Sequence, residues 1–346
     1  MKKRDVTNVG QATRRGVLGG MAAATLAPLG LGAAMAQTAR PSAPAAPTPP
    51  AAPAASAARP PMPQGGRGPL KVLFITQYKD FDRDDLFKTL DSMGDTISWT
   101  HVENPVAQVC FEPRIADQFD VFLFYDAYAG RDYNYDPATG RPRIDPVTGR
   151  PHIIENKPSQ ALQDSFRDLL RRGDKGFVFM HHAIASWVHT WPEYSEVIGA
   201  AADWTRPLTV RGKTYPPSGY REGVAQRISV VDKTHPVMQG VEDFDIVDEV
   251  YLCPIFEDSV HPLTRTNINN VPEYFRPAQA SHPLGSNMTS WVKTAENSPI
   301  VYLLHGHDKQ AYVNESFRKI LLNAINWAAS DESKAWARQN PSKIFA

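Results

Sequence analysis

An apolar run, Gly176–Met180, stops abruptly at two histidines, His181 and His182. A continuous apolar run of this length is typical of a strand that is buried on both faces of a parallel sheet. In an open α/β sheet, ligands bind at the carboxyl ends of such strands. The sequence therefore predicts a parallel sheet with two titratable imidazoles at its ligand-binding edge.

Two further apolar runs also end in polar side chains. Residues 120–126 end in Asp126, and residues 299–304 lead directly to His307 and Asp308. Residues 201–226 are expected to be rich in loops. Other strands are predicted at 71–76, 97–102, 228–231 and 244–251, and helices at 86–93, 162–170 and 317–328. This alternation predicts an α/β fold with a mostly parallel sheet flanked by helices on both faces.

The first part of the chain is expected to lie outside this fold. Residues 1–36 have the basic start, the apolar run and the A-x-A site of an export signal, and Thr13–Leu18 resembles a twin-arginine signal. Residues 37–69 are rich in Pro and Ala and predict a disordered linker. We expect the α/β domain at 70–330, a C-terminal tail at 331–346, and an exported protein in the periplasm or outside the cell.

Charge and cysteine content restrict the partners. Lys and Arg number 37, as do Asp and Glu, and removal of the signal leaves a net charge of about −4. No basic patch stands out, so nucleic acid is not an expected partner. No stable membrane span is expected once the signal is removed. Cys110 and Cys253 could form a disulfide or stay as buried thiols, and the sequence does not indicate the oligomeric state.

Parallel strands bring their carboxyl ends to one edge of the sheet. Asp126, His181, His182, His307 and Asp308 are therefore predicted to converge on one cleft although they lie far apart in the sequence. Imidazole titrates near neutral pH and suits proton transfer, and a carboxylate beside it fixes its tautomer. A lone histidine at a strand end is usually structural, but two such strand ends favour a functional site.

Alternation along a strand would send neighbouring histidines to opposite sides, so we expect only one of the pair to act. We assign the general base to His182, which lies nearer the turn. His307 is assigned the general acid, oriented by Glu249 or Asp308. Asp126, His181 and Asp308 are candidates for substrate binding.

Carbohydrate binding and metal binding are both compatible with the residue types. Four aromatic residues that follow the histidines could stack on a sugar ring: Trp187, Trp191, Tyr194 and Trp204. Trp191 could equally belong to the core. His182, His307 and a carboxylate are suitable ligands for a divalent metal, but nothing in their spacing selects one. No cofactor is predicted. The chain lacks the G-x-S-x-G, G-x-G-x-x-G, Walker A and H-E-x-x-H motifs.

These motifs, in this order, resemble the ThuA-like (trehalose utilisation) family, which has a class I glutamine amidotransferase-like fold of the flavodoxin type. The resemblance covers roughly residues 70–330. It rests on residues 71–76, 119–126, 175–187, Trp191–Tyr194, Ile198-Gly199, His235-Pro236, 248–251, 306–308 and the helix that ends at Trp327.

The resemblance implies a role in the use of trehalose and related disaccharides, including 3-keto sugars. Fold relatives carry a cysteine nucleophile where this chain has His181 and His182, so glutaminase activity is disfavoured. Residues 131–157 form an insertion with a tandem D-P-x-T-G-R-P-x-I repeat, which would be either a lid over the site or a surface loop. It replaces the short loop expected there and leaves the substrate size open.

Together these observations lead to one hypothesis and two alternatives. The hypothesis is an exported enzyme that uses His and carboxylate acid–base catalysis for elimination, isomerisation or hydrolysis of a keto-glycoside. The first alternative is a carbohydrate-binding protein without catalytic activity. The second is a metal-dependent hydrolase.

Overall fold

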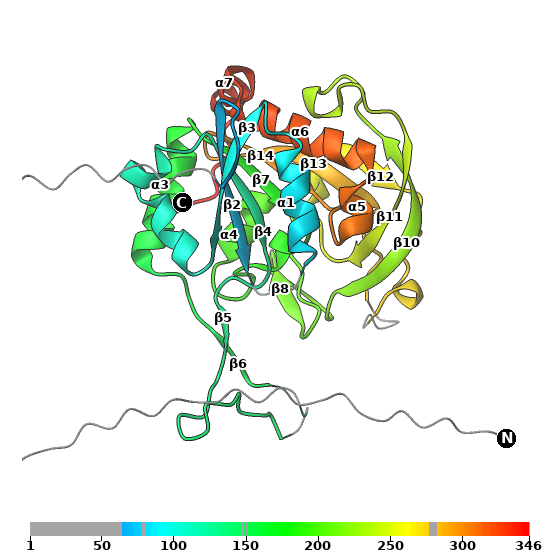
Figure 1. The fold of residues 1–346 in the computed structure, drawn as a ribbon. Coiled ribbons are helices and arrows are strands. Elements are labelled where there is room, and N and C mark those ends of the chain that lie inside the picture. The colour runs from blue at the N-terminus through cyan, green and yellow to red at the C-terminus, as the bar shows by residue number, and fades with distance from the viewer. Residues whose placement is uncertain (1–63, 78–80, 147–148, 150, 277–281, 346) are drawn as a thin grey trace, which may run out of the picture. The chain divides into compact units, whose positions relative to one another are not determined.

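A ten-stranded mixed sheet forms the centre of the protein in our computed structural model (Figure 1). The structure describes residues 64–77, 81–146, 149, 151–276 and 282–345. The strands, in sheet order, are β1 (Gly65–Gly66), β3 (Ile97–Glu103), β2 (Leu70–Gln77), β4 (Val121–Asp126), β7 (Gly176–Met180), β14 (Ser298–Leu303), β13 (Met288–Ala295), β12 (His261–Thr266), β10 (Gly219–Val230) and β11 (Phe244–Leu252). The helices are α1 (Arg83–Asp91), α2 (Pro113–Ala116), α3 (Gln160–Arg172), α4 (Pro192–Ile198), α5 (Lys309–Tyr312), α6 (Glu315–Ala329) and α7 (Asp331–Gln339).

The first half of the sheet is parallel and confirms the predicted α/β fold. Strands β3, β2, β4, β7 and β14 pair in parallel, and their order along the sheet is the flavodoxin-like one. From β14 onward the pairing changes, because β13, β12, β10 and β11 continue the sheet as antiparallel strands. Buried and exposed residues alternate in β10 from Val224 to Val230, as expected for an antiparallel strand with one face in the core.

Successive residues of the parallel strands point to opposite faces and build two cores. Phe177 and Phe179 of β7 face the layer that contains α3 and α4, where the Phe124 and Phe179 rings stack with centroids 4.4 Å apart. Val178 and Met180 face the layer that contains α1 and α6. Both faces of β7 are therefore buried in the core, so only residues at or beyond its carboxyl end can contribute to a site.

The insertion forms a two-stranded ribbon, β5 (Arg131–Tyr133) with β6 (Ile153–Glu155), that extends from the end of the sheet (Figure 1). Each copy of the repeat closes a turn: Gly140 N donates to Asp136 O at 2.8 Å, and Gly149 N donates to Asp145 O at 2.9 Å. Both glycines have φ near 65° (64° and 66°), in the left-handed region that favours glycine.

Several boundaries differ from the sequence predictions. Strand β1 lies within the predicted linker, and α7 belongs to the fold because it packs on β14 and α6. Phe345 is buried as well, so the domain continues through the predicted tail. The loop-rich stretch 201–226 contains most of β10 and a hairpin of β8 (Leu208–Val210) with β9 (Lys213–Tyr215). The predicted signal at 1–36 lies outside the described residues.

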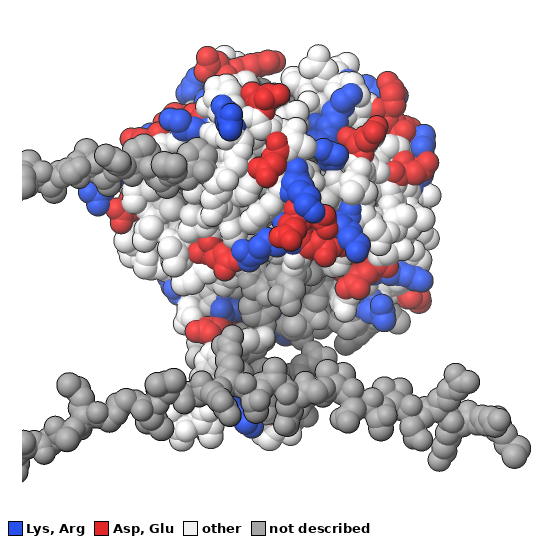
Figure 2. Space-filling view, viewed as in Figure 1, with Lys and Arg blue, Asp and Glu red and all other residues white. Residues whose placement is uncertain are grey.

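The surface and the cysteines fit the expectations from composition. On the face shown in Figure 2, basic and acidic side chains are mixed rather than separated. Cys110 and Cys253 are both buried free thiols. Among the helices of the described residues, none has the length and apolar character needed to span a membrane.

Candidate functional site

His181 occupies a sharp turn between β7 and a short 3-10 helix, His181–Ala185. Its φ is 55°, a conformation that costs energy for a residue with a side chain and that often marks a functional site. Hydrogen bonds hold it in place: Tyr302 Oη donates to His181 O at 2.7 Å, and His181 Nδ1 lies 2.7 Å from Leu304 O. Because a carbonyl can only accept, Nδ1 carries the proton and Nε2 presents its lone pair when the ring is neutral.

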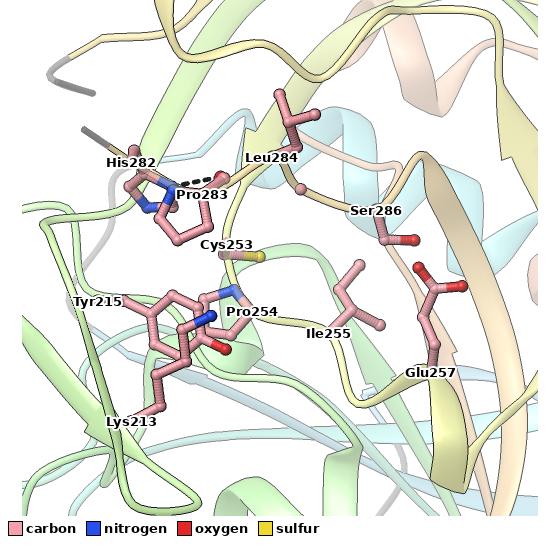
Figure 3. A pocket seen from close by; sticks show the side chains of 11 residues that line it. Lys213, Tyr215, Cys253, Pro254, Ile255, Glu257, His282, Pro283, Leu284 and Ser286 are labelled. Carbon is pink, nitrogen blue, oxygen red and sulfur yellow. Dashed lines mark hydrogen bonds between the residues drawn. The ribbon is translucent and has the colours of Figure 1, made fainter. Parts of the chain in front are cut away.

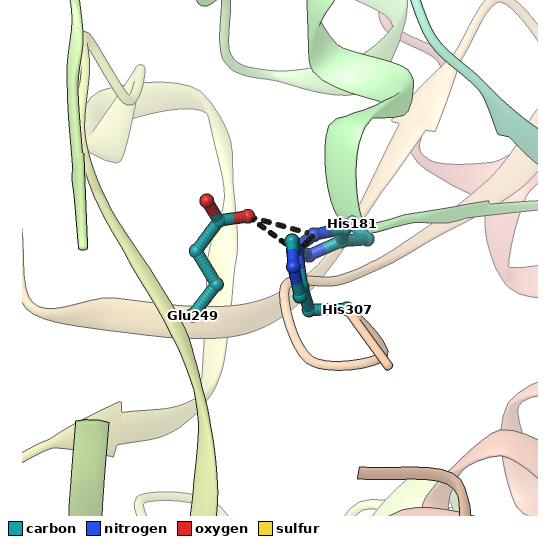
Figure 4. Close-up of side chains that lie close together, drawn as sticks. All are labelled: His181, Glu249 and His307. Carbon is teal, nitrogen blue, oxygen red and sulfur yellow. Dashed lines mark hydrogen bonds and ion pairs between the residues drawn. The ribbon is translucent and has the colours of Figure 1, made fainter. Parts of the chain in front are cut away.

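Glu249 and His307 meet this nitrogen (Figure 4). Glu249 Oε2 lies 3.0 Å from His181 Nε2 and 2.9 Å from His307 Nδ1, and the two nitrogens are 3.1 Å apart. Tyr251 Oη lies 2.7 Å from His181 Nε2. Three ionisable side chains, from the turn after β7, from β11 and from the loop after β14, therefore converge on one point, which we call the His–Glu–His cluster (His181, Glu249 and His307).

The cluster is buried except on one side. The side chain of His181 is 0% exposed and that of Glu249 is 5% exposed, whereas His307 is 14% exposed. Burial alone would raise the pKa of the Glu249 carboxyl, but its close interactions with His181 and His307 hold it well below its usual value. Burial raises the pKa of Tyr251 well above its usual value, so its hydroxyl stays protonated. Glu249 is therefore ionised, and His307 is the member of the cluster nearest to solvent.

Asp248 positions the loop that carries His307. Its carboxylate accepts from Gly306 N at 2.7 Å and from His307 N at 3.1 Å, and it pairs with His305 Nδ1 at 3.3 Å. Burial opposes ionisation, yet the nearby His305 ring and the backbone donors lower the pKa of Asp248. Gly306 has φ 119°, which favours glycine, and an added Cβ would lie 3.1 Å from Phe317.

The His–Glu–His cluster could also hold a divalent metal. Its three ligand atoms are 2.9–3.1 Å apart, close to the roughly 3.4 Å expected between tetrahedral ligands at about 2.1 Å from zinc. Metal-bound histidines usually donate their other ring N–H to a carbonyl or carboxylate, as His181 Nδ1 does to Leu304 O. The residues present therefore fit a metal as well as they fit proton transfer.

The structure separates the two adjacent histidines. His181, predicted only to bind substrate, is the one that joins Glu249 and His307. His182, predicted to be the base, lies beside Tyr125 with ring centroids 4.5 Å apart, and 5.0 Å from His181. The reason is that strand alternation ends at Met180, and the turn at His181 redirects the chain.

Asp126 and Asp308 lie at strand ends as predicted, but outside the cluster. Asp126 is buried and accepts from Ser186 Oγ at 2.9 Å, and burial raises its pKa to about 7. Asp308 caps α5 by accepting from Gln310 N at 2.8 Å. Of the two carboxylates predicted to orient His307, Glu249 is the one that contacts its ring.

Two of the tryptophans predicted to stack on a sugar lie in the core. Trp187 is 6% exposed and Trp191 is 3% exposed, and Trp191 packs against Phe166 and Tyr194. This is the core alternative that the sequence left open for Trp191. Neither indole presents an open face to a ligand in this structure.

The sequence indicated no role for Tyr251, and Trp204 was a candidate for sugar stacking only. Tyr251 contacts His181, and the Trp204 ring packs on Tyr251 with centroids 4.9 Å apart. The spacing of Tyr251 two residues after Glu249 was the available signal, since alternate residues of a strand share a face. Trp204 lies in a loop, and no periodicity could have placed it.

Buried ion pairs anchor the base of the ribbon beside Trp204. Arg131 of β5 pairs with Glu155 of β6 at 2.6 Å and with Asp203, and its side chain is only 3% exposed. The guanidinium lies over the Tyr128 ring at 4.0 Å from the centroid, and Tyr128 packs edge-on against Trp204. The ribbon is therefore connected through aromatic contacts to Tyr251, although its role as a lid or as a surface loop stays a prediction.

Comparisons with known proteins agree with this fold. A family model described as trehalose utilisation (ThuA) matches residues 153–328. A crystal structure of a ThuA-like protein from Parabacteroides merdae has 16% identity and a TM-score of 0.53, covering 76% of this chain and 90% of that chain. PurLQS from Thermotoga maritima has 12% identity and a TM-score of 0.40, covering 75% and 99%. None of the curated proteins compared with the chain matches it.

Proposed function

Because the chain belongs to the ThuA family, described as trehalose utilisation, we propose that it is an enzyme that acts on a carbohydrate at the His–Glu–His cluster. The single observation that carries this proposal is the convergence of His181, Glu249 and His307 at the carboxyl edge of the parallel strands. That edge is where open α/β sheets bind ligands. With the predicted signal at its start, the enzyme would work outside the cytoplasm.

The geometry supports proton transfer by a histidine–carboxylate pair. Glu249 Oε2 accepts from His307 Nδ1, which leaves the lone pair of neutral His307 on Nε2. His307 is also the most exposed member of the cluster, so its ring meets the substrate. His181 Nε2 lies 3.0 Å from the same carboxylate oxygen, so Glu249 Oε2 is held close to both rings. His307 is then the candidate base, in place of His182.

A keto-glycoside is the substrate class that this pair suits best. The keto group acidifies the adjacent C–H bond, and His307 removes that proton. The electron pair forms a carbon–carbon double bond as the glycosidic C–O bond breaks, and the leaving oxygen takes up a proton from the imidazolium. Addition of water to the double bond gives net hydrolysis. If the glycosidic C–O bond instead stays intact, the adjacent hydroxyl becomes the new carbonyl and the imidazolium returns its proton to the former carbonyl carbon, which gives isomerisation.

A panel of sugars tests this function. Trehalose, its 3-keto derivative and simple keto-glycosides are incubated with the protein, and products are followed by mass spectrometry. The proposal expects product from a keto sugar with the wild-type chain and none with His307→Ala. Binding in calorimetry without product from any sugar would instead favour the carbohydrate-binding alternative.

A metal-dependent hydrolase is the second candidate, because the three ligand atoms of the cluster are spaced as metal ligands. A bound divalent metal would polarise a substrate oxygen and lower the pKa of a bound water. Tyr251 and Asp248 would keep their positioning roles. Elemental analysis of wild-type protein and of Glu249→Gln distinguishes the candidates: stoichiometric metal lost in the variant supports the metal, and metal-free active protein excludes it.

A further inference from the structure

A second cavity, of about 180 Å³, lies between the β8–β9 hairpin, the chain that follows β11 and the segment before β13 (Figure 3). None of the three cluster residues lines it. A neighbouring cavity of about 360 Å³ shares the rim formed by residues 284–286. The two cavities together offer space for a small molecule that the function proposed above does not use.

His282 provides an unusual polar atom in the first cavity. The residue is only 5% exposed, and its Nδ1 donates to Pro283 O at 2.8 Å. This hydrogen bond fixes the tautomer, so that Nε2 is an acceptor. Nε2 is buried and has no hydrogen-bond partner among the residues that the structure describes. Buried polar atoms are nearly always paired, so this nitrogen indicates a donor that the described part of the chain does not supply.

The other lining groups define the chemistry of that donor. Tyr215 is half-buried and presents its ring, with the Lys213 ammonium 4.8 Å from the ring centroid. Figure 3 shows Tyr215 and His282 on one side of the cavity and Glu257 on the other. Glu257 is paired with Arg265 at 3.2 Å, so the uncompensated charge at the cavity is that of Lys213. An aromatic face, a neutral acceptor and an ammonium donor are the groups that bind a hydroxylated ring.

We propose that this cavity binds a small hydroxylated molecule of monosaccharide size. One hydroxyl donates to His282 Nε2, the apolar ring face lies against Tyr215, and Lys213 donates to a second oxygen. The adjoining cavity extends the site in the same manner, because Asn270 Oδ1 is a second buried acceptor without a partner among the described residues. The site is independent of the His–Glu–His cluster and does not rest on the proposed function.

Titration calorimetry with glucose and gluconate as probes tests this site in the full chain. His282→Phe keeps a ring of similar size but removes the acceptor, and should weaken binding about tenfold or more. Lys213→Met removes the ammonium from an exposed side chain, and should weaken gluconate more than glucose if Lys213 meets a carboxylate. The exposed His152 on the ribbon supplies a control, and His152→Ala should bind as wild type.

The His307→Ala variant separates this site from the cluster. Binding that persists in His307→Ala and is lost in His282→Phe supports the proposal. Thermal melting checks that His282→Phe is folded, and Lys213→Met gives an answer even if it is not. The proposal is overturned if neither probe binds, or if Lys213→Met and a folded His282→Phe both bind as wild type does, since the cavity would then hold only water.

Discussion

Asp248→Asn is predicted to destabilise the protein strongly although the side chain keeps its size. The carboxylate accepts from Glu249 N, Gly306 N and His307 N. An amide replaces one acceptor oxygen by an NH₂ group, which would face at least one of these donors. Each buried donor left unpaired costs about 1–3 kcal/mol, so we expect a loss of about 3 kcal/mol in the free energy of unfolding at pH 7. Urea denaturation followed by tryptophan fluorescence should show a midpoint about 1 M lower.

The pH dependence and a matched variant sharpen this test. The pKa of Asp248 is lower in the folded state than in the unfolded state, so its stabilisation is complete above about pH 4 and is lost as the pH falls below that value. The difference between wild type and Asp248→Asn should therefore narrow in acid. Asp245, on the same strand, has a side chain that is 79% exposed, and Asp245→Asn should change stability by less than about 0.5 kcal/mol. Equal stability of the two variants at pH 7 would refute the reasoning.

Three further predictions concern buried groups. Burial raises the pKa of Asp126 to about 7, so the folded protein keeps a proton that the unfolded chain releases, and stability falls between pH 4 and 7. Asp126→Asn should remove up to about 4 kcal/mol of this fall in the free energy of unfolding, measured by urea denaturation, and an unchanged pH profile would contradict it. Burial raises the pKa of the Cys253 thiol to about 12 and also raises that of Cys110, so a thiol reagent at pH 8 should label neither in native protein and both in urea; rapid native labelling would contradict this burial. Gly306→Ala should lower stability by about 1–3 kcal/mol, because φ is 119° and the new Cβ meets Phe317; an unchanged melting temperature would contradict the strain.

The parallel half of the fold follows from local patterns in the sequence. The apolar runs at 120–126, 176–180 and 299–304 predicted buried strands, and their shared edge follows from the geometry of parallel sheets. The antiparallel half was harder to predict because its pairings join segments far apart in the sequence. Its strand β11 brings Glu249 to the end of β7, and no periodicity specifies that contact.

The sequence predicted the residues of the site, but not which of the two adjacent histidines acts in it. Glu249 and His307 were expected to act together, and they lie 2.9 Å apart. The choice between His181 and His182 depended on whether the strand ended before or after the first histidine. The turn at His181 decides it, and a backbone conformation with positive φ is not visible in residue types. Trp187 and Trp191 were considered for sugar stacking because aromatic residues serve both cores and sugar sites, and only packing distinguishes the two.

The central claim is that His181, Glu249 and His307 form the chemical centre of this protein. The most direct test is the turnover of a 3-keto-glycoside by His181→Ala, Glu249→Gln and His307→Ala, each confirmed as folded, beside His152→Ala as the control. We predict that each cluster variant loses at least about 100-fold in turnover, the usual contribution of a positioned acid or base, while the control keeps wild-type activity. Wild-type turnover in a folded His307→Ala variant would contradict the claim.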